Sequence, residues 1–386
     1  MVAKCLNAMR MAIKNLNEAP GTKKVYSDAL NLLRFPLAVV VVSVHIFAAP
    51  FPMREELMEN SWLFREVNDF VFSFLRSQSV PIYFFISGYV FFLGITLDRA
   101  TFKRKLKNRF QSLFIPFVIW NLLMLGMHMA QDWLSPSEHT PLNLSVSGFL
   151  NIFWNSDYCI YPLNEHPGAS SIYPVNGPLW FLRDLMIIVL LTPAINWLTR
   201  RLGLVYLSIT GILYLVMSYL SIKHVGQLST ALFFFSWGAY MSIKQIDMLE
   251  AFGRLSTPSY VLYFLLAIVC MFALHYCPDA YKPIKTLNIF VGMLFAYNLA
   301  STLIRRYGFK SNELLASASF FIYISHRLLW SPILKAMVAI IHPTTGLTGV
   351  SVYVLTLLLT ISILLLAFWL MRKFTPSLLK VIAGRK

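Results

Sequence analysis

Long apolar runs separated by short polar segments fill the chain from about residue 30 to residue 371. Most runs are close to the length of about 20 residues that an α-helix needs to cross a bilayer. The pattern predicts ten spanning helices, over residues 30–50, 68–95, 112–131, 178–199, 203–222, 227–243, 258–276, 284–304, 315–340 and 348–371. The second run is long, and Pro81 within it predicts a kink. We therefore expect an all-α polytopic membrane protein.

The composition agrees with this fold class. Hydrophobic residues make up 57% of the chain and charged residues only 13%, which is more apolar surface than a soluble domain needs. The formal charge of +16 is spread over short clusters between the apolar runs, so it does not indicate nucleic-acid binding. The Cys and His residues lack the spacing of a metal site, and we expect no metal.

The distribution of basic residues predicts the orientation. Most of the 33 Lys and Arg residues lie in alternate connecting segments, whereas the opposite segments hold only five. Basic segments stay in the cytoplasm, so both termini are expected there, and the protein is expected in the inner (cytoplasmic) membrane. Residues 1–29 are then a cytoplasmic N-terminal segment without a secretory signal peptide, residues 30–371 the transmembrane domain, and residues 372–386 a cytoplasmic tail.

The first apolar run, Asn31 to Pro50, carries two unusual residues, Arg34 and His45. They are eleven positions apart, which on an α-helix gives one face and a separation of about 16 Å along the axis. Polar groups at membrane depth are costly and usually functional. The structural alternative is that Arg34 reaches a lipid headgroup and His45 makes a helix contact.

Other polar residues also fall within the predicted spans. Arg76, Arg183 and His326 must meet one another, water or a ligand, and we expect one polar cavity that opens outward, with Arg34 at its cytoplasmic end. An ion pair of Arg183 with Asp184, and a helix–helix hydrogen bond of His326, are the structural alternatives. Ser87 and Gly88 form a small-residue notch, which equally fits a close helix contact, and Ser87 lacks the surroundings of a hydrolase nucleophile.

Two connecting segments are distinctive. The segment from Leu97 to Ser112 is strongly basic, and Lys105 and Arg109 in it share a helix face. It can bind anionic lipid of the inner leaflet or a cytoplasmic polyanion. The outer segment 132–177 is long for a connection, and we interpret it as a lid over an outward-facing site.

Several stretches together resemble acyltransferase family three, the membrane O-acyltransferases that modify bacterial surface glycans. The resemblance spans about residues 30 to 371 and lies in the stretches RFPLAVVVVSVH (34–45), VPIYFFISGYVFF (80–92), KRKLKNRFQSLFIPFVIW (103–120), GPLWFLRDLM (177–186) and SFFIYISHRLL (319–329). One feature differs, because the Arg-x-x-Arg pair of many members has a single Arg here, Arg109.

The resemblance implies transfer of an acyl group, acetyl above all, from acyl-CoA to a sugar hydroxyl. In that reading Arg34, Lys105, Arg109 and Ser87 hold the donor, whose nucleotide end is polyanionic. His45 takes the proton of the acceptor hydroxyl, or carries the acyl group as an acyl-imidazole.

In the same reading Arg76, Trp180, Arg183 and His326 line the substrate channel, and Arg76 or Arg183 stabilises the oxyanion. The partners are then a carbohydrate acceptor and membrane lipid. The acceptor, the acyl group and the oligomeric state stay open.

A transporter of a glycan, lipid or small solute is the alternative function. Ten helices, buried charges and a long outer loop also fit a carrier. The pairing of Arg34 with His45 and the basic inner segment favour the enzyme, because a carrier needs neither.

Overall fold

The computed structural model describes residues 20–95, 97–134, 144–160, 172–220 and 223–384. Within these ranges all regular structure is helical, and helices overlap each of the ten ranges predicted to span the membrane. The all-α prediction is confirmed. The principal helices are α2 (Pro20–Phe47), α3 (Arg54–Asn60), α4 (Trp62–Phe70), α5 (Arg76–Phe92), α6 (Arg99–Arg109), α7 (Ile115–Leu134), α8 (Val146–Leu150), α9 (Trp180–Leu190), α10 (Thr192–Leu202), α11 (Leu204–Leu220), α12 (Lys223–Ile243), α13 (Met248–Gly253), α14 (Ser256–Tyr276), α15 (Pro278–Tyr307), α16 (Glu313–Ile341), α17 (Gly346–Phe374) and α18 (Pro376–Ile382).

The lengths of the helices support several membrane crossings. In the part of the chain that the structure describes, six helical stretches are long and apolar enough to cross a bilayer, and the bent pair α9–α10 makes a seventh if it is one span. The apolar stretches Gln78–Phe92 and Leu204–Leu220 are shorter. The count of ten and the cytoplasmic termini therefore stay predictions.

The predicted continuous helix over residues 178–199 is wrong, because the chain bends there by 62° between α9 and α10. Pro193 lies in the first turn of α10, directly after the bend. Proline has no amide hydrogen and clashes with a preceding turn, so it suits the start of a new helix better than the middle of one. The second predicted span is interrupted instead by a π-helical turn, η1 (Val71–Leu75), and α5 continues through Pro81.

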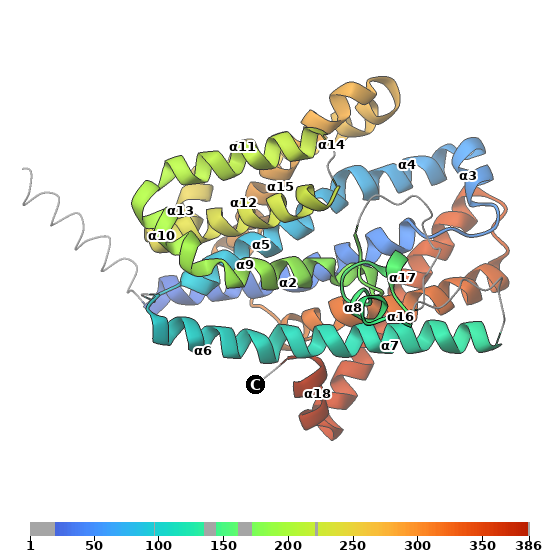
Figure 1. Cartoon of the computed structure of the whole chain (residues 1–386). Coiled ribbons are helices and arrows are strands. Elements are labelled where there is room, and N and C mark those ends of the chain that lie inside the picture. Colours follow the sequence, from blue (N-terminus) through green and yellow to red (C-terminus); the bar gives the residue numbers. More distant parts are fainter. Residues whose placement is uncertain (1–19, 96, 135–143, 161–171, 221–222, 385–386) are drawn as a thin grey trace, which may run out of the picture.

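The basic segment is also helical. Helix α6 continues through a second π-helical turn, η2 (Phe110–Phe114), into α7, and together they form a long rod along one side of the bundle (Figure 1). Lys and Arg are good helix formers, and the Asp98 carboxylate caps the start by accepting a hydrogen bond from the Thr101 amide at 2.7 Å. Lys105 and Arg109 are half-buried, whereas the other four basic side chains of α6 are exposed.

Helices α5 and α12 pack at backbone distance. A Cβ added at Gly88 would collide with the backbone of Phe235, and one at Gly238 with the backbone of Phe85 and Tyr89. Only glycine permits that approach. The notch beside Ser87 is therefore a helix contact, as the structural alternative predicted.

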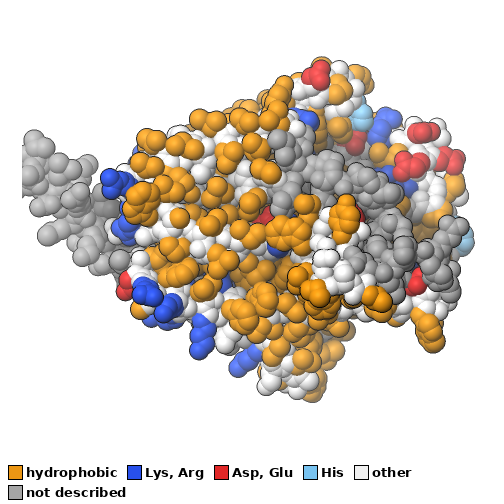
Figure 2. Space-filling view, in the orientation of Figure 1, with side chains coloured by type: hydrophobic (Ala, Val, Ile, Leu, Met, Phe, Trp, Pro, Cys, Tyr) orange, Lys and Arg blue, Asp and Glu red, His pale blue; other side chains and the backbone are white. Residues whose placement is uncertain are grey.

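Charge is sorted along the bundle. Figure 2 shows hydrophobic side chains across the middle of the visible face, Lys and Arg near the end where α6 begins, and Asp and Glu near the end where α3 lies. This separation agrees with the orientation expected from the sequence.

Candidate active site

A cavity of about 360 Å³ opens beside α2, and three predicted residues line it. Arg34 comes from α2, Ser87 from α5 and Arg109 from α6. The Tyr83 hydroxyl donates a hydrogen bond to the Arg34 carbonyl at 2.9 Å and fixes α5 against α2 at this level. Three segments far apart in the sequence therefore converge on one space.

The lining of the cavity is cationic. Among the described residues it includes two guanidinium groups and no Asp or Glu, together with serine and tyrosine hydroxyls and aromatic rings. Two like charges that line one cavity repel each other, and a polyanion between them relieves this repulsion. The arrangement suits a ligand with phosphate groups.

Lys105, the fourth residue predicted to hold the donor, lies elsewhere. Its Nζ donates a hydrogen bond to the carbonyl of Phe91, the last turn of α5, and stands 4.7 Å from the centroid of the Phe91 ring. It does not belong to the lining of the cavity. The i,i+4 spacing correctly placed Lys105 and Arg109 on one face, but the two side chains point to different surroundings.

His45 lies in the last turn of α2, at the opposite end of the helix face that Arg34 and His45 share, the Arg34 stripe. The His45 ring centroid is 5.3 Å from that of His326 in α16. His45 is half-buried, whereas His326 is fully buried. The two predicted histidines are thus neighbours, although 281 positions separate them in the sequence.

The tautomer of neutral His326 follows from its hydrogen bond. Its Nδ1 lies 2.7 Å from the carbonyl oxygen of Tyr323, which can only accept, so Nδ1 carries the proton. Nε2 is then an unprotonated acceptor, and it is one of several buried side-chain atoms with no hydrogen-bond partner among the described residues. Buried polar atoms are rarely left without a partner, and those that are often belong to functional sites.

Tyr323 connects the two parts of the site. Its side chain lines the cavity, its hydroxyl donates to the Pro178 carbonyl at 2.6 Å, and its own carbonyl accepts from His326. Neither histidine is among the described residues that line the cavity. Tyr323 therefore contacts both the cationic cavity and the histidine pair.

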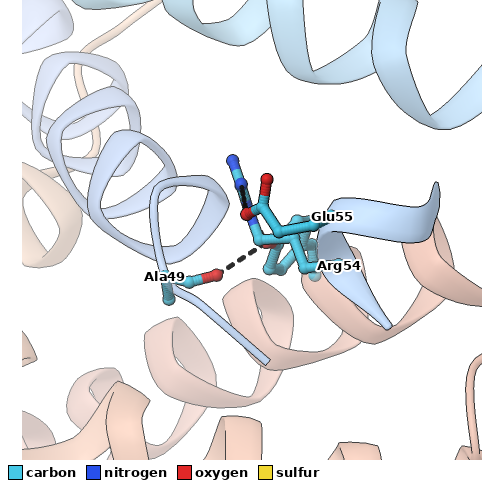
Figure 3. A network of polar contacts seen from close by, with 4 residues as sticks. Ala49, Arg54 and Glu55 are labelled. Atoms are coloured by element: carbon cyan, nitrogen blue, oxygen red, sulfur yellow. Dashed lines mark hydrogen bonds and ion pairs between the residues drawn. The ribbon is translucent and has the colours of Figure 1, made fainter. Parts of the chain in front are cut away.

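The chain beyond His45 is anchored by a polar network (Figure 3). The Tyr353 hydroxyl of α17 donates to the Ala49 carbonyl at 2.8 Å and accepts from Arg54 Nε at 3.2 Å. Arg54 also pairs with Glu55 at 2.7 Å. These contacts fix the exit of α2, and with it the last turn that carries His45.

Arg183 contacts three protein acceptors, while its Nη2 is buried with no hydrogen-bond partner among the described residues. Its Nε pairs with the Asp184 carboxylate at 2.9 Å, and Nη1 donates to the carbonyls of Trp154 and Ile172 at 3.0 and 3.1 Å. The guanidinium also lies over the Trp154 ring at 4.8 Å. The ion pair given above as the structural alternative is present, and Arg183 ties the outer segment to α9.

Trp180 begins α9 and packs, partly buried, against the main hydrophobic core. Arg76 begins α5, but its side chain lies outside the described residues. Trp180 is not among the described residues that line the cavity.

Part of the outer segment packs on the bundle near His326. Ile152, Cys159 and Val175 are buried against Met124 and Leu125 of α7. The Asn176 amide donates to Asn121 Oδ1 at 3.0 Å, and its side chain bonds the carbonyls of Trp120 and Ile324. Much of the predicted lid lies outside the described residues, at 135–143 and 161–171.

Sequence reasoning missed Tyr83, Tyr323, Asn121 and Asn176. Both tyrosines lie in stretches that carry the family resemblance, and the Tyr-x-x-His pattern of residues 323–326 was a signal for Tyr323 that received no role. Asn121 did offer a signal, because an amide within the apolar run 112–131 needs partners.

The sequence, the fold and this site agree with one class of protein. The family of acyltransferase domains matches residues 27–372, nearly the whole chain, and the protein belongs to this family, acyltransferase family three. With its apolar helices it is a multi-pass membrane acyltransferase.

Among curated proteins it is similar to the succinoglycan biosynthesis protein ExoH of Rhizobium meliloti (strain 1021). The two are 26% identical over 371 residues, which cover 93% of this chain and 92% of that protein. No solved structure matches the chain.

Proposed function

We propose that this protein transfers an acyl group, acetyl first among the candidates, from cytoplasmic acyl-CoA to a hydroxyl of an extracytoplasmic or lipid-linked carbohydrate. The carbohydrate acceptor is supported by the relative, whose name places it in the biosynthesis of succinoglycan. The family match favours this function over the alternative of a transporter. The inner membrane is the expected location, because both acyl-CoA and the basic segments belong to the cytoplasm.

The observation that supports the proposal most is the cationic cavity of Arg34 and Arg109 at one end of the α2 stripe that carries His45. The 3′-phosphate and diphosphate of CoA suit two guanidinium groups. The helical rise of about 16 Å between Arg34 and His45 is on the order of an extended pantetheine arm. The thioester can then reach His45 while the nucleotide stays in the cavity.

In this proposal His45 is the general base. It accepts the proton of the acceptor hydroxyl while the hydroxyl oxygen attacks the thioester carbonyl. The tetrahedral intermediate then collapses, the carbon–sulfur bond breaks, and the proton passes from His45 to the departing CoA thiolate. The alternative route forms an acyl-imidazole on His45 first, and ping-pong kinetics would reveal it.

His326 assists without carrying the proton itself. The His326 ring lies next to the His45 ring, and its unprotonated Nε2 can accept a hydrogen bond from a hydroxyl of the sugar. The contacts of Arg183 favour a structural role over oxyanion stabilisation, so Arg76 is the remaining candidate for the oxyanion.

Mass spectrometry of surface glycans tests the proposal. Glycans from cells with the protein should carry an acyl mass that is absent from cells without it, and from cells with the His45→Ala variant at equal protein level. Identical glycans in all three, with transport of a glycan lost instead, would support the carrier and overturn the proposal.

A further inference from the structure

The last helix, α18, folds back onto the bundle and becomes part of it. Leu379 and Ala383 are each only 4% exposed and belong to the main hydrophobic core. The sequence alone predicts only a cytoplasmic tail for residues 372–386. These two apolar groups attach the segment to the bundle, whereas most other residues of α18 are exposed.

A buried tryptophan fixes the end of this helix. The Trp120 indole of α7 donates a hydrogen bond from Nε1 to the Ile382 carbonyl at 2.9 Å, and Trp120 is itself 7% exposed. The last carbonyls of a helix have no partner within it, so a side-chain donor here holds the chain end in one place.

The turn that follows α18 touches the helix that carries Arg109. Gly384 has φ +63°, and a Cβ added to it would lie 2.7 Å from the backbone carbonyl carbon of Ser112. Both the left-handed conformation and this close approach require glycine. The turn therefore packs directly against Ser112 in η2, and Ser112 lies three residues after Arg109.

The same turn faces the cationic cavity. Ala383 and Gly384 line it together with Arg34, Arg109 and Ser112. The backbone of residues 383–384 thus forms one wall of this space, and the described lining contains no acidic group. The same backbone contacts the helical turn after Arg109 and holds that turn in place.

We propose that the Ala383–Gly384 turn is a wall of the acyl-donor site, and that Gly384 is a positioning residue that keeps Arg109 aimed at the polyanionic end of the donor. This inference rests on the proposed function. A side chain at position 384 would push the turn away from Ser112, so that Arg109 shifts relative to Arg34. Donor affinity should fall, whereas the chemistry at His45 should continue.

The test compares Gly384→Ala with Gly308→Ala in the purified full-length protein, with CoA as the probe. Gly308 also has a positive φ, of +66°, but a Cβ there would meet nothing within 4 Å. Both variants place a side chain at nearly the same positive φ, and only one of them disturbs the cavity. The measurements are the Kd for CoA, the Tm, and the KM and kcat for acyl transfer.

Gly384→Ala should weaken CoA binding by about tenfold relative to Gly308→Ala at a similar Tm, with kcat little changed. Equal CoA affinities of the two variants would overturn the inference and leave the proposed function standing. Absence of CoA binding by the wild-type protein would overturn both.

A second pair of variants applies if Gly384→Ala does not fold. Trp120→Phe removes the hydrogen bond to Ile382 and part of a buried ring, and Trp330→Phe makes the same change at a buried indole whose nitrogen has no hydrogen-bond partner among the described residues. Trp120→Phe should weaken CoA binding severalfold more than Trp330→Phe. Equal affinities in this pair would also overturn the inference.

Discussion

Arg34 and Arg183 are both arginines at membrane depth, but the groups that surround their charges differ. Arg183 pairs with Asp184 and donates to two backbone carbonyls, so protein groups compensate its charge. Arg34 lines a cavity together with a second arginine, and the described lining has no carboxylate. The sequence marked both residues in the same way, by their place within apolar helices.

The difference teaches that a charge at membrane depth does not define a site. A buried cation needs compensation, and protein groups or a ligand can supply it. Where the surrounding protein supplies it, as around Arg183, the arginine joins segments. Where two cations line one cavity, a ligand supplies the compensating negative charge, and such a cavity is the candidate binding site. The following substitutions separate the two regions.

The largest effect is expected for His45→Ala, which removes the proposed base at the far end of the Arg34 stripe. General base catalysis contributes about 10²–10⁴-fold, so kcat should fall by that amount. Protein yield, Tm and CoA affinity should stay close to wild type. Steady-state transfer assays with a parallel CoA titration check this, and near-normal turnover would remove His45 from the chemistry.

Arg183→Ala should act on stability. Breaking a buried ion pair costs about 3–5 kcal/mol, because the remaining charge loses its partner. Arg254→Ala is the matched control, since its pair with Glu250 is exposed and an exposed pair contributes at most about 1 kcal/mol. Thermal unfolding in detergent measures both. A stable Arg183→Ala protein with no activity would place Arg183 in the chemistry and break the contrast with Arg34.

His326 gives a smaller and more selective effect. His326→Ala removes the acceptor that its ring places beside His45, and the loss of a hydrogen bond of about 1–1.5 kcal/mol should lower kcat by about tenfold. His326→Gln keeps an acceptor oxygen and should restore most of the activity that Ala loses. A well-folded His326→Gln protein as inactive as His45→Ala would show that His326 also carries a proton.

The smallest effect is expected for Lys105→Ala. Lys105 contacts the Phe91 carbonyl and ring instead of the cavity, so its substitution should change the KM for acyl-CoA less than Arg109→Ala does. The remaining effect of Lys105 on the KM is its long-range electrostatic attraction of acyl-CoA, which salt screens over a distance of about 10 Å at 0.1 M. A salt titration of KM measures this, and equal effects of the two substitutions would mean that both side chains contact the donor.

Much of the helical architecture could be predicted, because apolar runs of bilayer length constrain the chain strongly. The bend after Leu191 and the π-helical turn before Arg76 could not be predicted, since they depend on the packing of the whole bundle. For the site, helical spacing relates Arg34 to His45 within one helix. No spacing relates His45 to His326, or Gly384 to Ser112, because tertiary contacts over long sequence distances leave no local periodicity.

The central claim is that the cavity of Arg34 and Arg109 binds the polyanionic end of acyl-CoA while His45 works at a distance from it. The most direct measurement is equilibrium binding of CoA to the wild-type protein and to Arg34→Ala, Arg109→Ala and His45→Ala. We predict that each arginine variant loses about 1.5–3 kcal/mol, or more than tenfold in affinity, as expected for a hydrogen bond to a charged group. His45→Ala should bind like wild type. Equal CoA affinity in all four proteins would contradict the account.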